Sequence, residues 1–187
     1  MKSTFATMTA SLALMAAVLG AALETVHRAT AAPIAQALEK EKTEAMESVL
    51  PQAADAASIG NGVEITVPGD TRPVTLYPVA SADGRLLAAA VETWTMDGFS
   101  GEITVMAGFT ADGALSGYRI LQSAETPGLG SKAQDWFTSI IGTTGPLKVS
   151  KDGGDVDAIT AATITSRAFL GAINRAREAF TFYTQQQ

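Results

Sequence analysis

The chain contains no cysteine and a single histidine, His27, among its 187 residues. The lack of cysteine excludes disulfides, thiolate metal sites, iron–sulfur clusters, cysteine nucleophiles and an N-terminal lipoprotein anchor. One histidine is too few for a histidine-based metal site without unusual partners. If the protein carries out redox chemistry, an organic cofactor must therefore carry the electrons.

Basic residues are also scarce: 13 Lys and Arg stand against 19 Asp and Glu, with a net charge of -6. Binding to nucleic acid requires a concentrated basic surface, so the composition argues against nucleic acid as a partner. The length suits one domain with its own core plus an appendage.

Residues 3–23 contain no charged side chain. This stretch matches the roughly 20 residues that a membrane-spanning helix needs, and it predicts a transmembrane anchor over residues 1–24. The alternative is a cleaved signal peptide with an Ala-x-Ala cleavage site at residues 29–31. Glu24 and Arg28 would then lie between the apolar core and the cleavage site, an unusually charged arrangement that favours the retained anchor.

A stalk helix is predicted over residues 25–51, with its most regular part at residues 34–50. That part lies between Pro33 and Pro51, and proline is typical of both borders of a helix. The soluble domain then spans residues 52–187. The stalk is expected to contact this domain through Leu38, Ala45, Met46 and Val49.

The middle of the chain shows the alternation of apolar and polar residues that is typical of strands. Strands are expected over residues 63–67, 74–79, 85–95, 102–109 and 115–122. Asp-Gly pairs that begin at Asp83, Asp97 and Asp112 lie between them, as hairpin turns do. This spacing predicts an antiparallel meander, and residues 53–62 before it are interpreted as a loop.

Two helices are predicted after the strands. The first covers residues 132–141 and carries Trp136, which like Trp94 is interpreted as a core residue. The second covers residues 165–183, where five side chains recur at steps of four, three, four and three: Phe169, Ile173, Ala176, Phe180 and Tyr183. They give the helix one apolar face for packing on a sheet. The predicted fold class is α+β, an antiparallel sheet packed with helices and preceded by one transmembrane helix.

Two motifs carry chemical information. Residues 125–130 read Glu-Thr-Pro-Gly-Leu-Gly, which predicts a shaped loop. Residues 155–167 crowd three threonines and a serine into the junction where the last predicted helix begins. Unpaired backbone N–H groups and the positive end of the helix dipole favour an anion at such a junction. A hydroxyl placed there could also carry that anion covalently.

The two motifs, in this order behind one apolar segment, resemble the FMN-binding domain of the Rnf complex G subunit. The C subunit of the sodium-pumping NADH:quinone reductase, Nqr, is a relative. The family pattern is Asp, two residues, Ser or Thr, Gly, Ala, and then the Thr or Ser that is flavinylated. Asp157 and Thr160 match its beginning, and Thr163 matches the flavin acceptor. Ala161 replaces the usual glycine, and if the backbone there needs a positive φ, alanine costs free energy that glycine does not.

The resemblance implies covalent FMN, joined through a phosphoester to Thr163 by a dedicated flavin transferase. A phosphoester leaves the flavin ring chemically free, so the protein tunes the ring by contacts alone. The implied cofactor-binding residues are Asp157, Thr160, Ala161, Ala162 and Thr163 in one motif, and Glu125, Thr126, Gly128, Leu129, Gly130 and Lys132 in and after the other.

Individual roles follow for some of these residues. Leu129 is expected to pack on the flavin ring, and Lys132 to lie near a polar edge of the ring or the phosphate. The alternative for Thr163 is a helix N-cap, since threonine hydroxyls commonly satisfy the first N–H groups of a helix. Thr165 and Ser166 are interpreted as caps. No catalytic residue and no metal ligand is expected.

The function that the resemblance implies is electron transfer within a membrane complex. This chain would be one relay of an ion-translocating ferredoxin:NAD oxidoreductase that couples electron flow to sodium or proton transport. Its partners would be the other Rnf subunits, including a second flavin-bearing membrane subunit. It would be a single-pass protein of the cytoplasmic membrane, with its domain on the periplasmic or extracellular side. The alternatives are the Nqr C subunit and a flavin-free extracytoplasmic binding module.

Overall fold

The computed structural model describes residues 5–50, 58–128 and 130–186. The chain forms two compact units, residues 1–42 and residues 43–187. Each unit is described by itself.

Helix α1 (Phe5–Val49) makes up the first unit, and its last turns belong to the second. Within the described residues it is the one helix long and apolar enough to cross a membrane. The expected helix start after Pro33 is wrong, because α1 continues through this residue. Proline removes one backbone hydrogen bond. Good helix formers surround it, among them Ala31, Ala32 and Ala35, and they favour helix on both sides of the proline.

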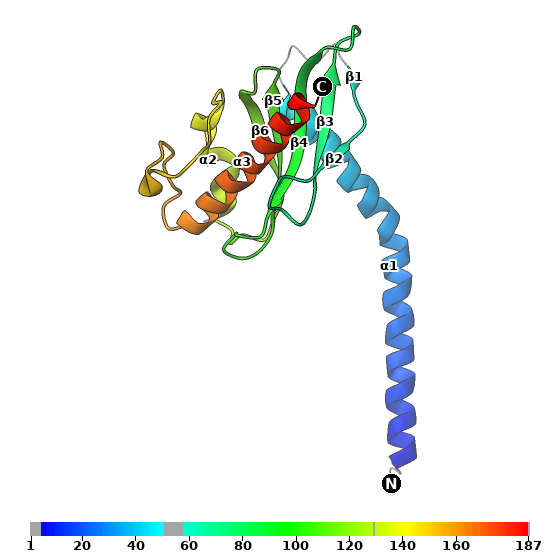
Figure 1. Cartoon of the computed structure of the whole chain (residues 1–187). Coiled ribbons are helices and arrows are strands. Elements are labelled where there is room, and N and C mark those ends of the chain that lie inside the picture. Colours follow the sequence, from blue (N-terminus) through cyan, green and yellow to red (C-terminus); the bar gives the residue numbers. More distant parts are fainter. Residues whose placement is uncertain (1–4, 51–57, 129, 187) are drawn as a thin grey trace. The chain divides into compact units, whose positions relative to one another are not determined.

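The second unit is built on a six-stranded antiparallel sheet (Figure 1). Its strands are β1 (Ser58–Ile59), β2 (Val63–Ile65), β3 (Val74–Ala80), β4 (Leu86–Thr95), β5 (Ile103–Thr110) and β6 (Leu115–Ser123). Strands β3 to β6 form the expected meander, while β1 and β2 both pair with β3 at the edge of the sheet. Gly84 and Gly113 both have a φ of 82°, which explains glycine in two of the three predicted turns. The α+β prediction is confirmed.

Strand β1 corrects the loop predicted over residues 53–62. Ile59 pairs with Val79, and the Gly60 N–H donates to the Pro78 carbonyl at 2.7 Å. A strand of two residues is too short to show the alternation of apolar and polar residues by which strands are predicted. Only its pairing with the edge of β3 identifies it as a strand. Residues 53–57 lie outside the described residues.

One face of the sheet is covered by helix α3 (Thr163–Gln185), drawn orange to red in Figure 1. Side chains of β4 and β5 alternate between the two faces. Those that meet α3 include Ala89, Val91, Val105, Ala107 and Phe109. The predicted helical face is confirmed, because four of its five side chains are buried in this core and Tyr183 packs against it.

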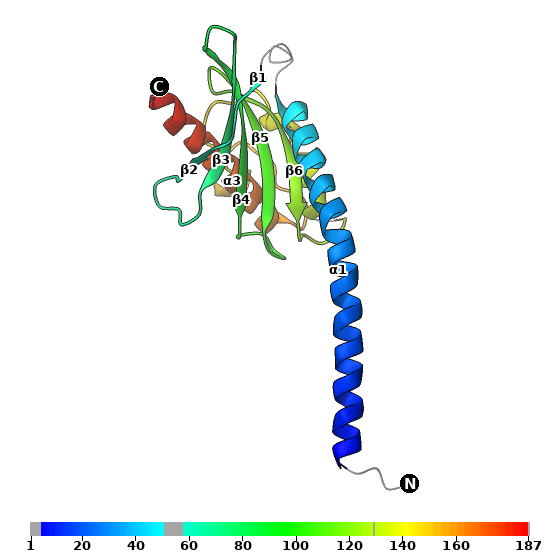
Figure 2. The same ribbon diagram turned by 90° about the vertical axis from the view of Figure 1, so that its right-hand side faces the viewer.

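The opposite face is covered by the last turns of α1, residues 43–49 (Figure 2). Ala45 and Val49 are buried there against Ala90 and Met106, with Met46 partly buried beside them, as predicted. Leu38 belongs to the other unit, so its expected contact with the domain stays a prediction.

The approach of α1 to the sheet depends on two paired glycines, Gly108 and Gly117. A Cβ on Gly108 would lie 2.0 Å from the Val49 carbonyl oxygen, and one on Gly117 would lie 3.1 Å from the Val49 Cα. The Ser116 hydroxyl donates to that carbonyl at 2.5 Å. The sheet therefore both makes room for the end of the helix and holds its last carbonyl.

The helix predicted over residues 132–141 is broken into three short pieces: η2 (Gly130–Lys132), α2 (Ala133–Trp136) and η3 (Thr138–Ile140). The break falls at Phe137, whose φ of -94° and ψ of 32° are not helical. This turn buries Phe137 beneath α3, where its ring stacks on Phe169 at 4.9 Å.

Neither tryptophan is a buried core residue. Trp136 is 42% exposed, so its core assignment is wrong. Trp94 is partly buried at the edge of the core. The guanidinium groups of Arg72 and Arg175 lie over its ring, at 4.6 and 4.9 Å from the ring centre.

Candidate functional site

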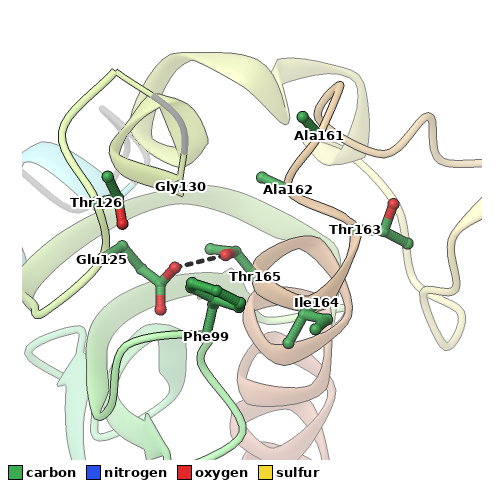
Figure 3. Close-up of a pocket in the computed structure, with 9 residues that line it drawn as sticks. All are labelled: Phe99, Glu125, Thr126, Gly130, Ala161, Ala162, Thr163, Ile164 and Thr165. Carbon is green, nitrogen blue, oxygen red and sulfur yellow. Dashed lines mark hydrogen bonds between the residues drawn. The ribbon is translucent and has the colours of Figure 1, made fainter.

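The two motifs, far apart in the sequence, meet at a cleft of about 330 Å³. Figure 3 shows the first motif on one side of this cleft and the start of α3 on the other. The lining residues are Phe99, Glu125, Thr126, Gly130, Ala161, Ala162, Thr163, Ile164 and Thr165. Six of them belong to the set implied by the resemblance.

Glu125 joins the segments that surround the cleft. Its carboxylate accepts a hydrogen bond from the Thr165 hydroxyl at 2.6 Å and another from the Ser100 N–H at 3.0 Å. The residue is only 7% exposed. A buried carboxylate requires such partners, so it fixes the first turn of α3 and the β4–β5 loop relative to its own loop.

Two glycines make the space for this carboxylate. A Cβ on Gly98 would lie 2.7 Å from Glu125 Oε1, and one on Gly130 would lie 2.6 Å from Oε2. Gly98, the glycine of the second predicted turn, does not have the positive φ of Gly84 and Gly113. It therefore acts by its lack of a side chain.

The N-terminus of α3 is not capped by a side chain. Its N-cap residue is Ala162, which carries no hydroxyl. The capping interpretation of Thr165 and Ser166 is wrong, because the Thr165 hydroxyl donates to Glu125 and the Ser166 hydroxyl accepts from the Ile159 N–H. The first N–H groups of this 23-residue helix thus have no side-chain cap, an arrangement that favours an anion.

Thr163 is the first residue of α3 and is half-buried at the cleft. Its hydroxyl accepts a hydrogen bond from Lys151 Nζ at 3.3 Å. Since the N-cap position belongs to Ala162, the N-cap alternative for Thr163 is wrong. The hydroxyl lies beside a cation.

Ala161 has a φ of 63°, the left-handed conformation that favours glycine. This is the condition under which alanine was expected to cost free energy at this position. The chain nevertheless keeps the turn that brings Ala162 and Thr163 to the cleft.

Lys151 belongs to a short loop that packs next to the second motif. Within this loop, η4 (Ser150–Asp152) is enclosed by a bridge between Val149 and Val156. Asp152 accepts two hydrogen bonds from Arg167, both at 2.7 Å, and these lower the pKa of the Asp152 carboxyl. The pair connects the loop to the second turn of α3.

Four other described residues that the resemblance implies are not among those that line the cleft. Asp157 is exposed; it accepts from the Ser150 hydroxyl through its side chain and from Trp136 Nε1 through its carbonyl. Thr160, Gly128 and Lys132 are exposed. Leu129 lies outside the described residues, so its expected contact with the flavin ring stays a prediction.

Sequence reasoning missed Phe99. It lies in the loop between β4 and β5, follows an Asp-Gly pair, and lines the cleft while 69% exposed. The only signal in the sequence was an aromatic residue in a glycine-rich turn, which is common without any function.

Comparison with known proteins places these observations in a family. Residues 98–178 match the model of the FMN-binding domain, a range that includes both sides of the cleft. The G subunit of the ion-translocating oxidoreductase complex of Vibrio cholerae serotype O1 is 32% identical over 94% of this chain and 90% of that relative. The chain belongs to this G-subunit family. The family expected from the two motifs is confirmed.

Other members of the G-subunit family match over a shorter region. The relative from Erwinia tasmaniensis is 42% identical over 57% of this chain and 55% of its own length. The relative from Shewanella piezotolerans is 38% identical over 63% of this chain and 60% of its own length. The chain thus spans somewhat more than half the length of these two relatives.

The residues of the cleft fit the cofactor for which this FMN-binding domain is named. The uncapped N-terminus of α3 and Lys151 suit its phosphate. Phe99 and Ile164 offer apolar surface to its ring, and Thr126 and Gly130 leave space on the other side. FMN is an organic redox cofactor, which agrees with the expectation for redox chemistry in a chain without cysteine.

Proposed function

We propose that this chain is an electron-transfer subunit of a membrane ion-translocating oxidoreductase complex and carries FMN in a phosphoester with Thr163. The single observation that supports the linkage most directly is the position of the Thr163 hydroxyl. Thr163 is one of the residues that line the cleft, at an uncapped helix N-terminus, and its hydroxyl lies 3.3 Å from Lys151 Nζ. A phosphodiester carries one negative charge, which the helix dipole and the ammonium group would both stabilise.

The attachment is a phosphoryl transfer without any redox change. The O–H bond of Thr163 breaks and an Oγ1–P bond forms, while a P–O bond to the leaving group breaks and the proton departs with that group. The donor is FMN activated as a phosphoanhydride, since a free phosphate has no adequate leaving group. No general base touches Thr163 among its described contacts, and a flavin transferase supplies that chemistry.

Bound FMN would accept and pass on electrons, and the residues of this chain would hold and orient it. Thr163 would anchor it, Lys151 would neutralise its phosphate, and Glu125 would maintain the shape of the cleft. Asp157, Thr160, Gly128, Leu129 and Lys132 remain proposed members of the site. Catalysis belongs to the assembly rather than to this subunit.

The partners would be the other subunits of the complex, including a second flavin-bearing membrane subunit. The complex would move electrons between ferredoxin and NAD and couple this to sodium or proton transport. Residues 1–24 would anchor the chain in the cytoplasmic membrane. Residues 25–51 would form the stalk, whose last turns pack on the sheet, and residues 52–187 would form the rest of the domain on the periplasmic or extracellular side. The G-subunit relatives support this assembly over the Nqr alternative.

The test is co-expression of the full chain with a flavin transferase, followed by denaturing electrophoresis and peptide mass mapping. The wild-type band is expected to fluoresce, and the mass of FMN less one water is expected on the peptide containing Thr163. Thr163→Ala should abolish the signal, and Thr163→Ser should retain part of it because a hydroxyl remains.

Thr126→Ala is the matched control, because Thr126 carries the other accessible hydroxyl of the cleft lining. This variant should keep the fluorescent band. An unmodified wild-type peptide would instead support the flavin-free binding module. A signal that survives in Thr163→Ala but disappears in Thr126→Ala would move the attachment to the first motif.

A further inference from the structure

Phe99 is the only aromatic residue among the described residues that line the cleft. Its ring is 69% exposed, on the loop between β4 and β5. Ile164, which also lines the cleft, is 50% exposed. Figure 3 shows both side chains at the same end of the cleft, near the first turn of α3. Two large apolar side chains thus present uncovered surface to one cavity.

The loop that carries Phe99 is held firmly on both sides of that residue. The N–H of the next residue, Ser100, donates to the buried carboxylate of Glu125. The preceding residue, Gly98, packs so closely that a Cβ would lie 2.2 Å from the Gly101 carbonyl oxygen and 2.7 Å from Glu125 Oε1. These contacts fix the backbone on both sides of Phe99, so the loop presents its aromatic side chain to the cleft, where a flat, apolar ligand surface could stack on it.

We propose that Phe99 is the stacking face for the isoalloxazine ring of the FMN attached at Thr163, a positioning role that rests on the proposed function. Aromatic rings favour offset-stacked contact with a flat heteroaromatic system. The opposite wall of the cleft is formed by small or polar residues such as Thr126 and Gly130, which leave room for that ring. The phosphoester fixes one end of the cofactor, and Phe99 fixes the other.

The loop also supplies an internal control. Met96 is 61% exposed on the same β4–β5 connection but does not line the cleft. A substitution there changes exposed apolar surface to a similar extent without touching the proposed ring position.

The experiment uses full-length, flavin-loaded protein in detergent and compares Phe99→Trp with Met96→Trp. Indole in face contact with a flavin quenches its fluorescence by electron donation, whereas phenyl does not. The fluorescence per bound flavin, normalised to flavin absorbance, is expected to fall at least fivefold in Phe99→Trp and to stay within about a fifth of wild type in Met96→Trp. Equal fluorescence in the two variants would overturn the stacking role.

A second measurement covers the case in which the larger indole lowers loading. In Phe99→Ala the isoalloxazine ring should lose its stacking partner, while covalent loading stays unchanged. The anisotropy of the flavin fluorescence should therefore fall, and quenching of this fluorescence by iodide should rise at least twofold. Unchanged anisotropy and iodide quenching in this variant would also refute the role of Phe99. Loss of covalent flavin from the wild type itself would instead refute the attachment, so the two failures are distinguishable.

Discussion

At the scale of single residues, Ala161 shows how a small departure from a family pattern is accommodated. It is the only residue other than glycine with a positive φ among those that the structure describes. A Cβ in this conformation meets the neighbouring carbonyl oxygen, which costs roughly 1–2 kcal/mol. The turn persists because its neighbours Ala162 and Ile159 are buried and because the Ile159 carbonyl accepts from the Ala162 N–H at 3.0 Å.

Ala161→Gly is therefore expected to stabilise the domain by about 1 kcal/mol, since glycine removes the strain and loses part of the gain to chain entropy. The midpoint of denaturant unfolding measures this effect. Ala162→Gly is the control, because Ala162 has a φ of -131° and no such strain. The control should be destabilised, and stabilisation of both variants by the same amount would contradict the explanation.

Glu125 is the residue on which the cleft most depends. Glu125→Ala removes the acceptor for both the Thr165 hydroxyl and the Ser100 N–H and leaves a cavity between two glycines. The expected loss of unfolding free energy is about 2–4 kcal/mol. Glu125→Gln retains the volume and one acceptor oxygen, so it should lose less.

Chemical denaturation of both Glu125 variants measures the difference, and flavin loading of the same samples reports the shape of the cleft. If Glu125→Ala unfolded at the wild-type midpoint, the carboxylate would not join the segments as described.

At the scale of elements, the end of α1 depends on the smallness of two sheet residues. Gly108→Ala would place a methyl group 2.0 Å from the Val49 carbonyl oxygen, so the helix end must move away from the sheet. Overpacking of this kind is expected to cost about 1–3 kcal/mol. Thermal unfolding of the domain should register the loss.

Gly171→Ala is the matched control for that substitution. Gly171 is exposed in the interior of α3, and a Cβ there would meet nothing within 4 Å. This variant should gain about 0.5–1 kcal/mol, because alanine has the higher helix propensity. The opposite sign of the two changes tests the close approach specifically.

The broken helix that follows the first motif is fixed to β6 by Tyr118. The Tyr118 hydroxyl donates to the Ala133 carbonyl at 3.2 Å and accepts from the Phe137 N–H at 3.1 Å. Burial raises the pKa of Tyr118 above its ordinary value of 10.0, with a smaller contribution from the charge of Asp135. The neutral form is therefore favoured in the folded state.

Because the folded pKa is raised, this contribution to stability is fully present below pH 10 and is lost as the pH rises through the folded value. Wild type should lose unfolding free energy in that alkaline range more steeply than Tyr118→Phe, which cannot ionise. At neutral pH the variant should be less stable by about 1 kcal/mol because it loses both hydrogen bonds. Denaturation at several pH values measures the unfolding free energy of both proteins, with tyrosinate absorbance as the second signal. Parallel curves of unfolding free energy against pH for wild type and Tyr118→Phe would contradict this explanation.

At the scale of the whole molecule, the compact domain begins at Thr43 and so includes the end of α1. A chain that starts at Thr43 keeps Ala45 and Val49 and should fold without detergent. A chain that starts at Gln52 leaves Ala90 and Met106 uncovered and should be less stable by about 2–4 kcal/mol. The denaturant midpoints of the two shortened chains, and their solubility relative to the full chain, check both statements. Equal midpoints of the two shortened chains would show that the end of α1 is dispensable.

The sequence by itself determined the elements whose signal is local. The alternation of apolar residues located β3 to β6, and the steps of three and four along Phe169, Ile173 and Phe180 identified the buried face of α3. These patterns survive in one dimension because each repeats with the period of its own backbone. The two motifs could be recognised because each is contiguous in the chain.

Only the tertiary structure decided which residues share the cleft. Hydrogen bonds to Glu125 bring Ser100 and Thr165 together over separations of 25 and 40 residues. No periodic signal reports such a pairing, and Phe99 became part of the site only through it. The positive φ of Ala161 was likewise set by packing of the surrounding core, and so was the N-cap position of α3, which falls on Ala162 and not on a nearby threonine or serine. This packing overrode the conformations that these residue types favour locally.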